Sequence, residues 1–272
     1  MVRCGPITLA CLVLPQFLGL CCGCASRHKP PALPLATEPT CIADRQVTLE
    51  SGKVAFDLYL PASSREAPLV VVAHGFSRSK ANMAGWGRRL AEEGFVAAVP
   101  TLPAWSDHRL NGRSINELIH WLCTDSPYVQ YIQRDRLGVM GFSAGGLSSL
   151  LAAADNPAIL IWVGLDPVDR SGWGAAAATR LPAQAVILRA EPSPWNAQGN
   201  AAGIERALAG RCRSIRIAGA VHIDAEWPTD WAAELACGRS DEQKRAAFAQ
   251  HAVVALKSEL MHLDGQARLP CR

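Results

Sequence analysis

The stretch that decides the fold is LGVMGFSAG, residues 137–145. Its first four residues form a short apolar run typical of a buried strand, and small residues from 143 to 154 predict a helix. Between them, the pattern Gly-x-Ser-x-Gly centres on Ser143 and indicates a tight strand-to-helix turn that presents a nucleophilic serine. Glycine at 141 and 145 removes side chains that would collide in such a turn, and the helix N-terminus favours developing negative charge beside the hydroxyl. Ser143 is therefore the predicted nucleophile.

Strands and helices alternate along the rest of the chain. Short apolar runs without a polar face predict buried strands at residues 69–73, 95–99, 159–165 and 185–188, with further strands at 54–60 and 214–217. Apolar spacing and stop signals predict helices at residues 81–93, 114–123, 201–209 and 246–260. In the helix at 114–123, Ser114 and Glu117 fit a capping box. This alternation predicts a mostly parallel, doubly wound α/β sheet flanked by helices.

Composition narrows the functional classes. The chain has 272 residues, is 49% hydrophobic and carries a formal net charge of +3, with no long run of like charges. Such a small, evenly spread charge gives no argument for binding nucleic acid. No spacing of cysteine and histidine indicates a metal site, and the chemistry predicted for Ser143 needs neither a metal nor a cofactor.

The first 40 residues are interpreted as an export segment and a linker. Arg3 precedes an apolar run that is short for a membrane span, so residues 1–24 predict a signal peptide. The letters LCCGCAS around Cys24 resemble a bacterial lipoprotein cleavage site, which predicts a lipid on Cys24 as a membrane anchor. Plain secretion and a signal-anchor helix stay open as alternatives. Proline-rich residues 25–40 predict a flexible tether, and residues 41–272 the catalytic domain.

Five cysteines follow the leader, namely Cys41, Cys123, Cys212, Cys237 and Cys271. In an exported protein cysteines can pair, and the odd number leaves at least one of them free. A bridge between the last two is favoured because it would hold the C-terminus, although sequence does not determine the pairing. The oligomeric state is likewise not indicated.

A general base and two oxyanion donors are predicted around the nucleophile. His222 follows the strand at 214–217, and an unperturbed imidazole titrates near pH 6.5, which suits proton exchange with a serine. Phe76 follows His74 and Gly75 at the end of the strand at 69–73, where hydrolases with this turn place one oxyanion amide. The residue after the nucleophile, Ala144, provides the other. His74 itself is interpreted as structural.

Three carboxylates are considered as the group that orients the base. Asp166 and Asp169 follow the strand at 159–165, and Glu191 follows the strand at 185–188. Either strand end can bring a carboxylate to the imidazole, where it selects the tautomer and stabilises the imidazolium. Asp166 is preferred because it comes directly off its strand.

Several stretches resemble the chlorophyllase and polyester-hydrolase (cutinase-like) branch of the α/β hydrolases. The most specific is GLDPVD at residues 164–169, and PWN at 194–196 and HID at 222–224 also match. The resemblance covers residues 47–257 and implies the α/β-hydrolase fold, ester hydrolysis and a triad with Asp166 as the acid. Departures from plant chlorophyllases at Phe142, Ala144 and Val221 argue against chlorophyll as the substrate, and the predicted export signal favours an extracellular ester.

The favoured interpretation is an exported serine esterase that acts on a small or polymeric ester. Trp105 and Trp195 lie on predicted strand-end loops and are the aromatic residues expected to contact such a substrate. Two other functions are considered. An acyltransferase would use the same triad with an acceptor other than water, and a binding lipoprotein would keep the fold without catalysis.

Overall fold

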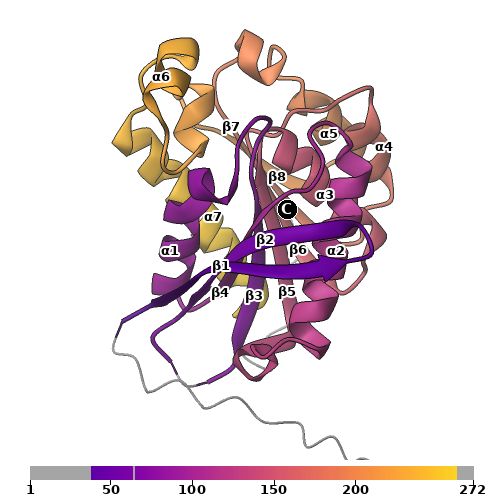
Figure 1. The fold of residues 1–272 in the computed structure, drawn as a ribbon. Coiled ribbons are helices and arrows are strands. Elements are labelled where there is room, and N and C mark those ends of the chain that lie inside the picture. Colours follow the sequence, from indigo (N-terminus) through magenta and orange to yellow (C-terminus); the bar gives the residue numbers. More distant parts are fainter. Residues whose placement is uncertain (1–37, 64, 262–272) are drawn as a thin grey trace, which may run out of the picture. The chain divides into compact units, whose positions relative to one another are not determined.

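One mixed sheet forms the centre of the structure, a computed structural model that describes residues 38–63 and 65–261, all within a unit spanning residues 32–272. Its eight strands lie in the order β1-β2-β4-β3-β5-β6-β7-β8 (Figure 1). β2 pairs antiparallel with both β1 and β4, and every other neighbouring pair is parallel. The strands are β1 (Thr40–Leu49), β2 (Gly52–Leu60), β3 (Ala67–Ala73), β4 (Val96–Thr101), β5 (Ile132–Phe142), β6 (Ile159–Leu165), β7 (Gln184–Arg189) and β8 (Cys212–Arg216).

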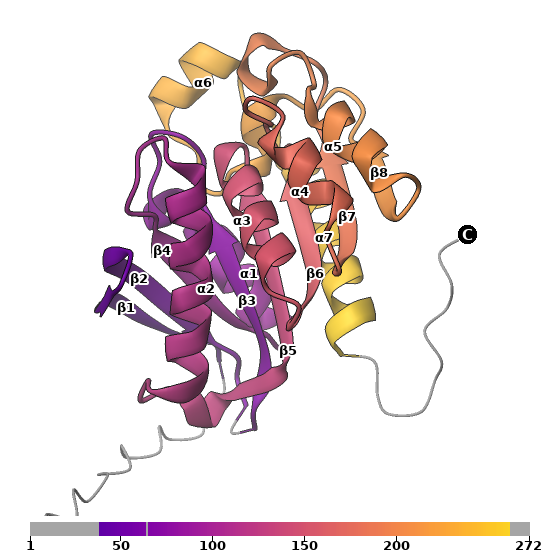
Figure 2. The same ribbon diagram turned by 90° about the vertical axis from the view of Figure 1, so that its right-hand side faces the viewer.

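Helices cover both faces of this sheet, as Figure 2 shows. α2, α3, α4 and α5 pack on one face, and α1 and α7 pack on the other, with a separate apolar core on each side. The α-helices are α1 (Ala84–Glu92), α2 (His108–Thr124), α3 (Ala144–Asp155), α4 (Trp173–Thr179), α5 (Ala201–Leu208), α6 (Trp231–Cys237) and α7 (Glu242–Leu260). Short 3-10 helices are η1 (Lys80–Met83), η2 (Val129–Tyr131), η3 (Pro194–Asn196) and η4 (His222–Ala225).

β3 illustrates why the central strands have no polar face. Leu69 and Val71 lie in the core beneath α2 and α3, whereas Val70 and Val72 lie in the core beneath α1 and α7, and none of the four is more than 1% exposed. Side chains that alternate between two dry faces must all be apolar. The predicted fold class, a mostly parallel sheet between two helical layers, is confirmed.

The predicted start of the helix at 114–123 is wrong. α2 begins at His108, and the Asp107 side chain caps it by accepting a hydrogen bond from the Leu110 amide (2.9 Å). Ser114 is buried inside the helix, and Glu117 instead accepts hydrogen bonds from the amide and hydroxyl of Ser51 (2.9 and 2.6 Å). The proposed capping box therefore does not form. The early turns tolerate Gly112 because α3 packs closely there, and a Cβ at 112 would lie 3.1 Å from the Ser148 carbonyl oxygen.

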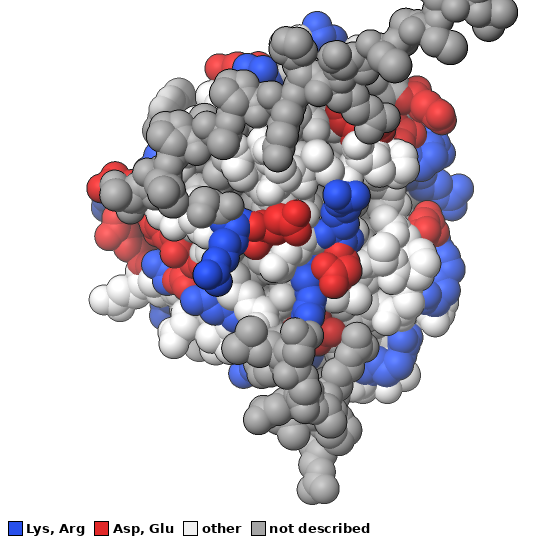
Figure 3. Space-filling model, turned by 90° about the horizontal axis from the view of Figure 1, so that it is seen from below, with Lys and Arg blue, Asp and Glu red and all other residues white. Residues whose placement is uncertain are grey.

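Three elements carried too little signal to be predicted. β1 is an edge strand with no buried residue, so it lacks the apolar alternation that reveals a strand. α4 and α6 have only seven residues each, too few to establish a helical period. On the face seen in Figure 3, acidic and basic side chains of the described residues lie interspersed, in agreement with the small net charge.

Candidate functional site

The turn between β5 and α3 holds Ser143 in an unusual backbone conformation. Its φ of 53° and ψ of −120° lie where residues with a Cβ are rarely found. Three main-chain hydrogen bonds hold it there: the Ser143 amide donates to the Leu165 carbonyl (3.1 Å), and its carbonyl accepts from the amides of Gly146 (2.9 Å) and Val168 (3.1 Å). The strain is thus offset by contacts with β6 and with the loop that follows it.

The two glycines of the motif are required by backbone packing. A Cβ on Gly141 would lie 2.2 Å from the Gly145 carbonyl oxygen, and one on Gly145 would lie 2.3 Å from the His74 carbonyl oxygen. Both distances are far inside van der Waals contact with main-chain atoms that have little freedom to move. Only glycine at these positions lets the turn pack against the loop that follows β3.

His222 links the hydroxyl of Ser143 to the carboxylate of Asp166. The Ser143 Oγ lies 3.0 Å from His222 Nε2, and His222 Nδ1 lies 2.6 Å from Asp166 Oδ2. All three side chains are at least nine-tenths buried. Because a carboxylate only accepts, Nδ1 carries a proton and Nε2 is free to accept the serine proton. The Phe142 ring, 4.7 Å from the imidazole between centroids, packs against His222 and limits its rotation.

Asp166 is itself held by two donors. Its Oδ1 accepts from the Ala190 amide at the end of β7 (3.0 Å), and its Oδ2 accepts from Asn196 Nδ2 (3.0 Å). Asp166 has a positive φ of 42°, and its amide donates to the Leu188 carbonyl (2.7 Å). The carboxylate, only 1% exposed, is therefore fixed from both oxygens.

Asn196 is a residue of the site that sequence reasoning missed. It is 1% exposed, and its Oδ1 accepts from the amides of Ser193 (2.8 Å) and Gly199 (2.9 Å). Its Nδ2 donates to the Glu191 carbonyl (2.9 Å) as well as to Asp166. The PWN letters at 194–196 were a signal at this position, but nothing in them pointed to the carboxylate.

The other carboxylates considered for the acid lie elsewhere. Asp169 accepts from the amides of Gly174 (2.6 Å) and Ala175 (3.2 Å) at the start of α4. Glu191 accepts from the Gly219 amide (3.0 Å) and faces Arg216. Neither carboxylate forms a hydrogen bond with His222 within the described chain.

His74 joins the loop after β3 to the end of β4. Its Nδ1 donates to the Gly75 carbonyl (2.8 Å), and its Nε2 accepts from the Leu102 amide (2.9 Å). Both ring nitrogens are thus used, and burial lowers the pKa of His74, so the imidazole is neutral. The loop then presses onto the turn, because a Cβ on Gly75 would lie 3.3 Å from the Ser143 Cβ.

The two predicted oxyanion amides belong to the residue after Ser143 and to the loop whose Gly75 packs on Ser143. Ala144 is the first residue of α3, where backbone amides have no partner within the helix. Phe76 lies on the loop after β3, and its amide makes no main-chain hydrogen bond to another described residue. Amides that lack a main-chain partner can bind developing negative charge, so both stay candidate oxyanion donors.

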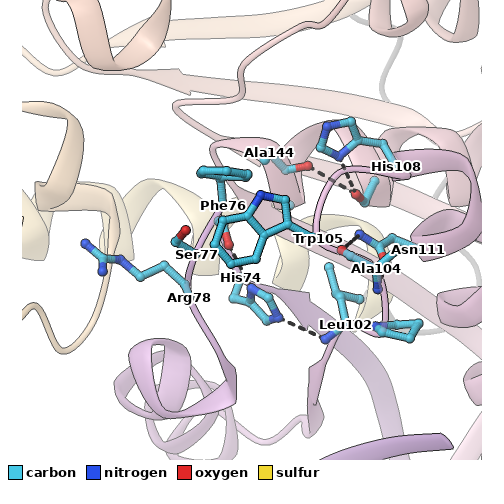
Figure 4. Close-up of a pocket in the computed structure, with 14 residues that line it drawn as sticks. His74, Phe76, Ser77, Arg78, Leu102, Ala104, Trp105, His108, Asn111 and Ala144 are labelled. Atoms are coloured by element: carbon cyan, nitrogen blue, oxygen red, sulfur yellow. Dashed lines mark hydrogen bonds between the residues drawn. The ribbon is translucent and has the colours of Figure 1, made fainter.

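A pocket of about 510 Å3 opens beside these amides (Figure 4). Phe76 and Trp105 meet edge-to-face in its wall, with ring centroids 4.8 Å apart, and they are 50% and 70% exposed. His108, which is buried, lies 3.4 Å from the Ser148 hydroxyl on another part of the wall. Trp195 is half-exposed on η3 and does not line this pocket. The structure therefore brings Trp105, but not Trp195, to the cavity beside Ser143.

Other sequence predictions concern cysteines and the leader. Cys41, Cys123, Cys212 and Cys237 are free thiols, and Cys271 lies outside the described residues, as do Cys24, the signal peptide and the tether up to residue 37. Within the described ranges, no three potential ligand side chains gather as a metal site. Among the described helices, none has the length and apolar character needed to cross a bilayer.

Comparison with solved structures defines the class. The chain has the α/β-hydrolase fold: dienelactone hydrolase from Anabaena variabilis superposes with a TM-score of 0.64 at 20% identity, over 82% of this chain and 99% of that one. A model of the PET hydrolase-like family matches residues 30–191, more than half of the chain. The chain therefore belongs to the PET hydrolase-like family, and the predicted polyester-hydrolase branch is confirmed.

Curated relatives match over a shorter region. Bis(hydroxyethyl) terephthalate hydrolase from Streptomyces coelicolor is 31% identical over 134 residues, 47% of this chain and 43% of that protein. A cutinase from Thermobifida alba is 27% identical over 113 residues, 40% of this chain and 38% of that protein. The matched region spans less than half the length of these relatives.

Proposed function

We propose that this protein is a serine hydrolase that cleaves carboxylic esters through an acyl-enzyme intermediate. Ser143 is the nucleophile, His222 is the general base and then the general acid, and Asp166 orients His222. The observation that carries the proposal is the unbroken hydrogen-bonded chain from the Ser143 hydroxyl through both nitrogens of His222 to Asp166. The relatives named as a terephthalate ester hydrolase and as cutinases support an ester as the substrate.

The first half of the reaction acylates Ser143. Its Oγ attacks the ester carbonyl carbon while His222 Nε2 takes the hydroxyl proton. The amides of Phe76 and Ala144 bind the oxyanion, and each such donor contributes about 3 to 4 kcal/mol of transition-state stabilisation. When the intermediate collapses, the ester C–O bond breaks and His222 returns its proton to the leaving alcohol.

The second half releases the acid. Water attacks the acyl carbon while His222 Nε2 takes a proton from the water. The bond between the acyl carbon and Ser143 Oγ then breaks, and His222 returns the proton to the serine oxygen. Asp166 stays ionised throughout and stabilises the imidazolium in each half. Its two donors, the Ala190 amide and Asn196, keep the carboxylate aligned with Nδ1.

The pocket supports an ester with an apolar, aromatic-sized group. Phe76 and Trp105 offer ring edges and faces next to the oxyanion amides, and the remaining wall includes buried polar groups that can orient a substrate. Trp105 is therefore proposed as a substrate contact. A contact from Trp195 and export of the protein, with or without a lipid on Cys24, stay predictions.

Labelling by a fluorophosphonate tests the proposal. The full-length protein is expected to hydrolyse short p-nitrophenyl esters and to carry one phosphonyl adduct on Ser143, found by peptide mass spectrometry. Ser143→Ala is the control and should lose both signals, with a rate loss on the order of a million-fold in a triad of this kind. Absence of labelling in the folded wild-type protein would reject the assignment. Added alcohols that divert most of the acyl group from water would instead identify a transferase.

A further inference from the structure

A buried ion pair joins two loops that carry different parts of the proposed site. Arg78 lies two residues after Phe76 on the loop that follows β3, and Glu226 directly follows η4, which begins with His222. The Arg78 Nε lies 2.9 Å from Glu226 Oε1, and Arg78 also lies 3.4 Å from the Asp230 carboxylate. Arg78 lines the pocket beside Ser143.

Glu226 is a costly residue to bury. Its side chain is 0% exposed, and neither carboxylate oxygen accepts a well-formed hydrogen bond from the described residues. A buried carboxylate loses its hydration, and a nearby cation is what compensates for that loss. Arg78, with a side chain only 22% exposed, is the cation that pairs with the Glu226 carboxylate. The mechanism proposed above does not use either group.

Hydrogen bonds also hold the base loop (residues 222–227) from two sides: Arg245 Nε in α7 donates to the Glu226 carbonyl (3.1 Å), and further bonds reach the segment after Arg78. The Trp227 amide donates to the Asn82 carbonyl and the Gly85 amide donates to the Trp227 carbonyl, both at 3.0 Å. The indole of Trp86 donates to the Ala225 carbonyl (2.9 Å). These contacts attach the loop to η1 and α1. The ion pair also attaches the base loop to the loop after β3 that carries Phe76 (the oxyanion loop), at the wall of the pocket.

We propose that Arg78 and Glu226 are positioning residues that keep the oxyanion amide of Phe76 in register with the imidazole of His222. This inference rests on the proposed function. Phe76 and His222 are 146 positions apart in the sequence and must act on the same carbonyl group at the same moment. A displacement of about 1 Å between them is enough to cost on the order of a hundredfold in rate. The ion pair links them closely, because Glu226 lies four residues after His222 and Arg78 lies two residues after Phe76.

The charge state of the pair depends on pH. Burial raises the pKa of Glu226 to about 7, the neighbouring Asp230 raises it further, and Arg78 opposes them. The charged, titratable or polar groups that face Glu226 come from four other elements: Arg78, Asn82, Asp230, Cys237 and Arg245, whose Nε donates to the Glu226 carbonyl (3.1 Å). Above about pH 7 the carboxylate is ionised and the pair is complete; below it, the proton weakens the attachment.

As the pH rises through about 7, ionisation of Glu226 should therefore lower the stability of the fold and raise the activity. A carboxyl with a raised pKa in the folded state contributes stability that is complete below its ordinary pKa of 4.5 and is lost as the pH rises through about 7. Glu226→Gln removes that cost above pH 7, so the variant should melt no lower than the wild type there. A residue with a purely structural role would show a loss of stability together with the loss of activity.

The experiment measures kcat, KM and melting temperature of full-length Glu226→Gln across the pH range on both sides of 7. We expect kcat above pH 7 to fall about tenfold or more with KM within about twofold. As the pH falls below about 7, the ratio of wild-type to Glu226→Gln kcat should fall toward one, because protonation of Glu226 removes the ionised pair from the wild type as well. Arg78→Lys, which keeps the charge, should lose less than Arg78→Met, and the double variant Arg78→Met with Glu226→Gln should lose no more than Arg78→Met alone.

Asp230→Asn is the matched control. Asparagine caps α6 as well as aspartate does, and the change removes the exposed partner of Arg78 while leaving Glu226 in place. Its kcat should stay within about twofold of the wild type. A Glu226→Gln variant with wild-type kcat above pH 7, or with a deficit in kcat that does not shrink as the pH falls below about 7, overturns the proposal, and so does an equal loss in Asp230→Asn. If Glu226→Gln fails to fold, equal activity of Arg78→Met and the wild type overturns it in the same way. A wild-type protein that no fluorophosphonate labels would reject the proposed function itself.

Discussion

On the nucleophile side of the proposed centre the main chain sets the geometry, whereas on the acid–base side side-chain hydrogen bonds set it. Ser143 and the amides beside it are held because glycine backbones pack within van der Waals distance of one another. Asp166 and His222 come from loops after different strands and are aligned through Asn196 and the Ala190 amide. The first arrangement tolerates no added atoms, and the second should fail gradually as donors are removed.

Removal of the Asp166 charge should have the largest effect. Asp166→Asn keeps the shape but takes away the acceptor that selects the His222 tautomer, so kcat for a p-nitrophenyl ester should fall about ten-thousandfold. Asp169→Asn is the matched control, because Asp169 contacts only α4 and the Asn200 side chain in the described structure. A loss of the same size in the control would show that the loop, and not the triad, had been damaged.

A single added methyl group should break the nucleophile side. Gly145→Ala places a Cβ 2.3 Å from the His74 carbonyl oxygen, so the turn must shift. We expect activity to fall at least about a hundredfold and the free energy of unfolding to fall by about 1 to 3 kcal/mol. Urea unfolding and initial rates measure both. Gly203→Ala in α5, where the nearest atom is 4.0 Å from the added Cβ, should keep full activity; if it matched Gly145→Ala, the steric account would be wrong.

Loss of one donor should weaken the acid–base side without abolishing it. Asn196→Ala removes the 3.0 Å hydrogen bond to the buried Asp166 carboxylate together with three bonds to the main chain of its own loop. The bond to the carboxylate is worth about 1.5 to 3 kcal/mol, so kcat should fall about ten- to a hundredfold. Asn200→Ala removes a comparable bond from the neighbouring loop without touching Asp166 and should leave kcat close to the wild type. Equal losses in the two variants would contradict a role for Asn196 in the site.

The smallest effect is expected at the pocket wall, which belongs to neither side. Trp105→Ala removes an exposed ring from the pocket wall. An aromatic contact with the substrate is worth about 0.5 to 1.5 kcal/mol, so KM for an aromatic ester should rise about two- to tenfold while kcat changes little. Trp231→Ala, at an exposed tryptophan that does not line the pocket, is the control. A fall in kcat without a rise in KM would mean that Trp105 positions the oxyanion loop and does not contact the substrate.

The same difference explains what could be predicted from the sequence. The nucleophile side is local in sequence. Nine consecutive residues hold the strand at 137–140, the glycines at 141 and 145 and Ser143. The neighbouring strand β3 is also predictable, because it contains four apolar side chains in a row. The acid–base side is built from four residues that are far apart in the sequence, at positions 166, 190, 196 and 222. No local pattern predicts that Asn196 contacts Asp166. The order of the residues and the Asp-Pro-Val letters suggested Asp166, but Arg78 and Glu226 had no signal at all, because only the folded chain brings residues 148 positions apart into contact.

Trapping of the acyl-enzyme tests the central claim most directly. The full-length protein is mixed with a p-nitrophenyl ester, quenched in acid during the first turnover and digested for mass spectrometry. We expect an acyl group on the peptide that contains Ser143, and no adduct when His222 is replaced by alanine. Rapid ester cleavage with the acyl group on another residue, or with no adduct at all under conditions where product release shows a burst, would contradict it.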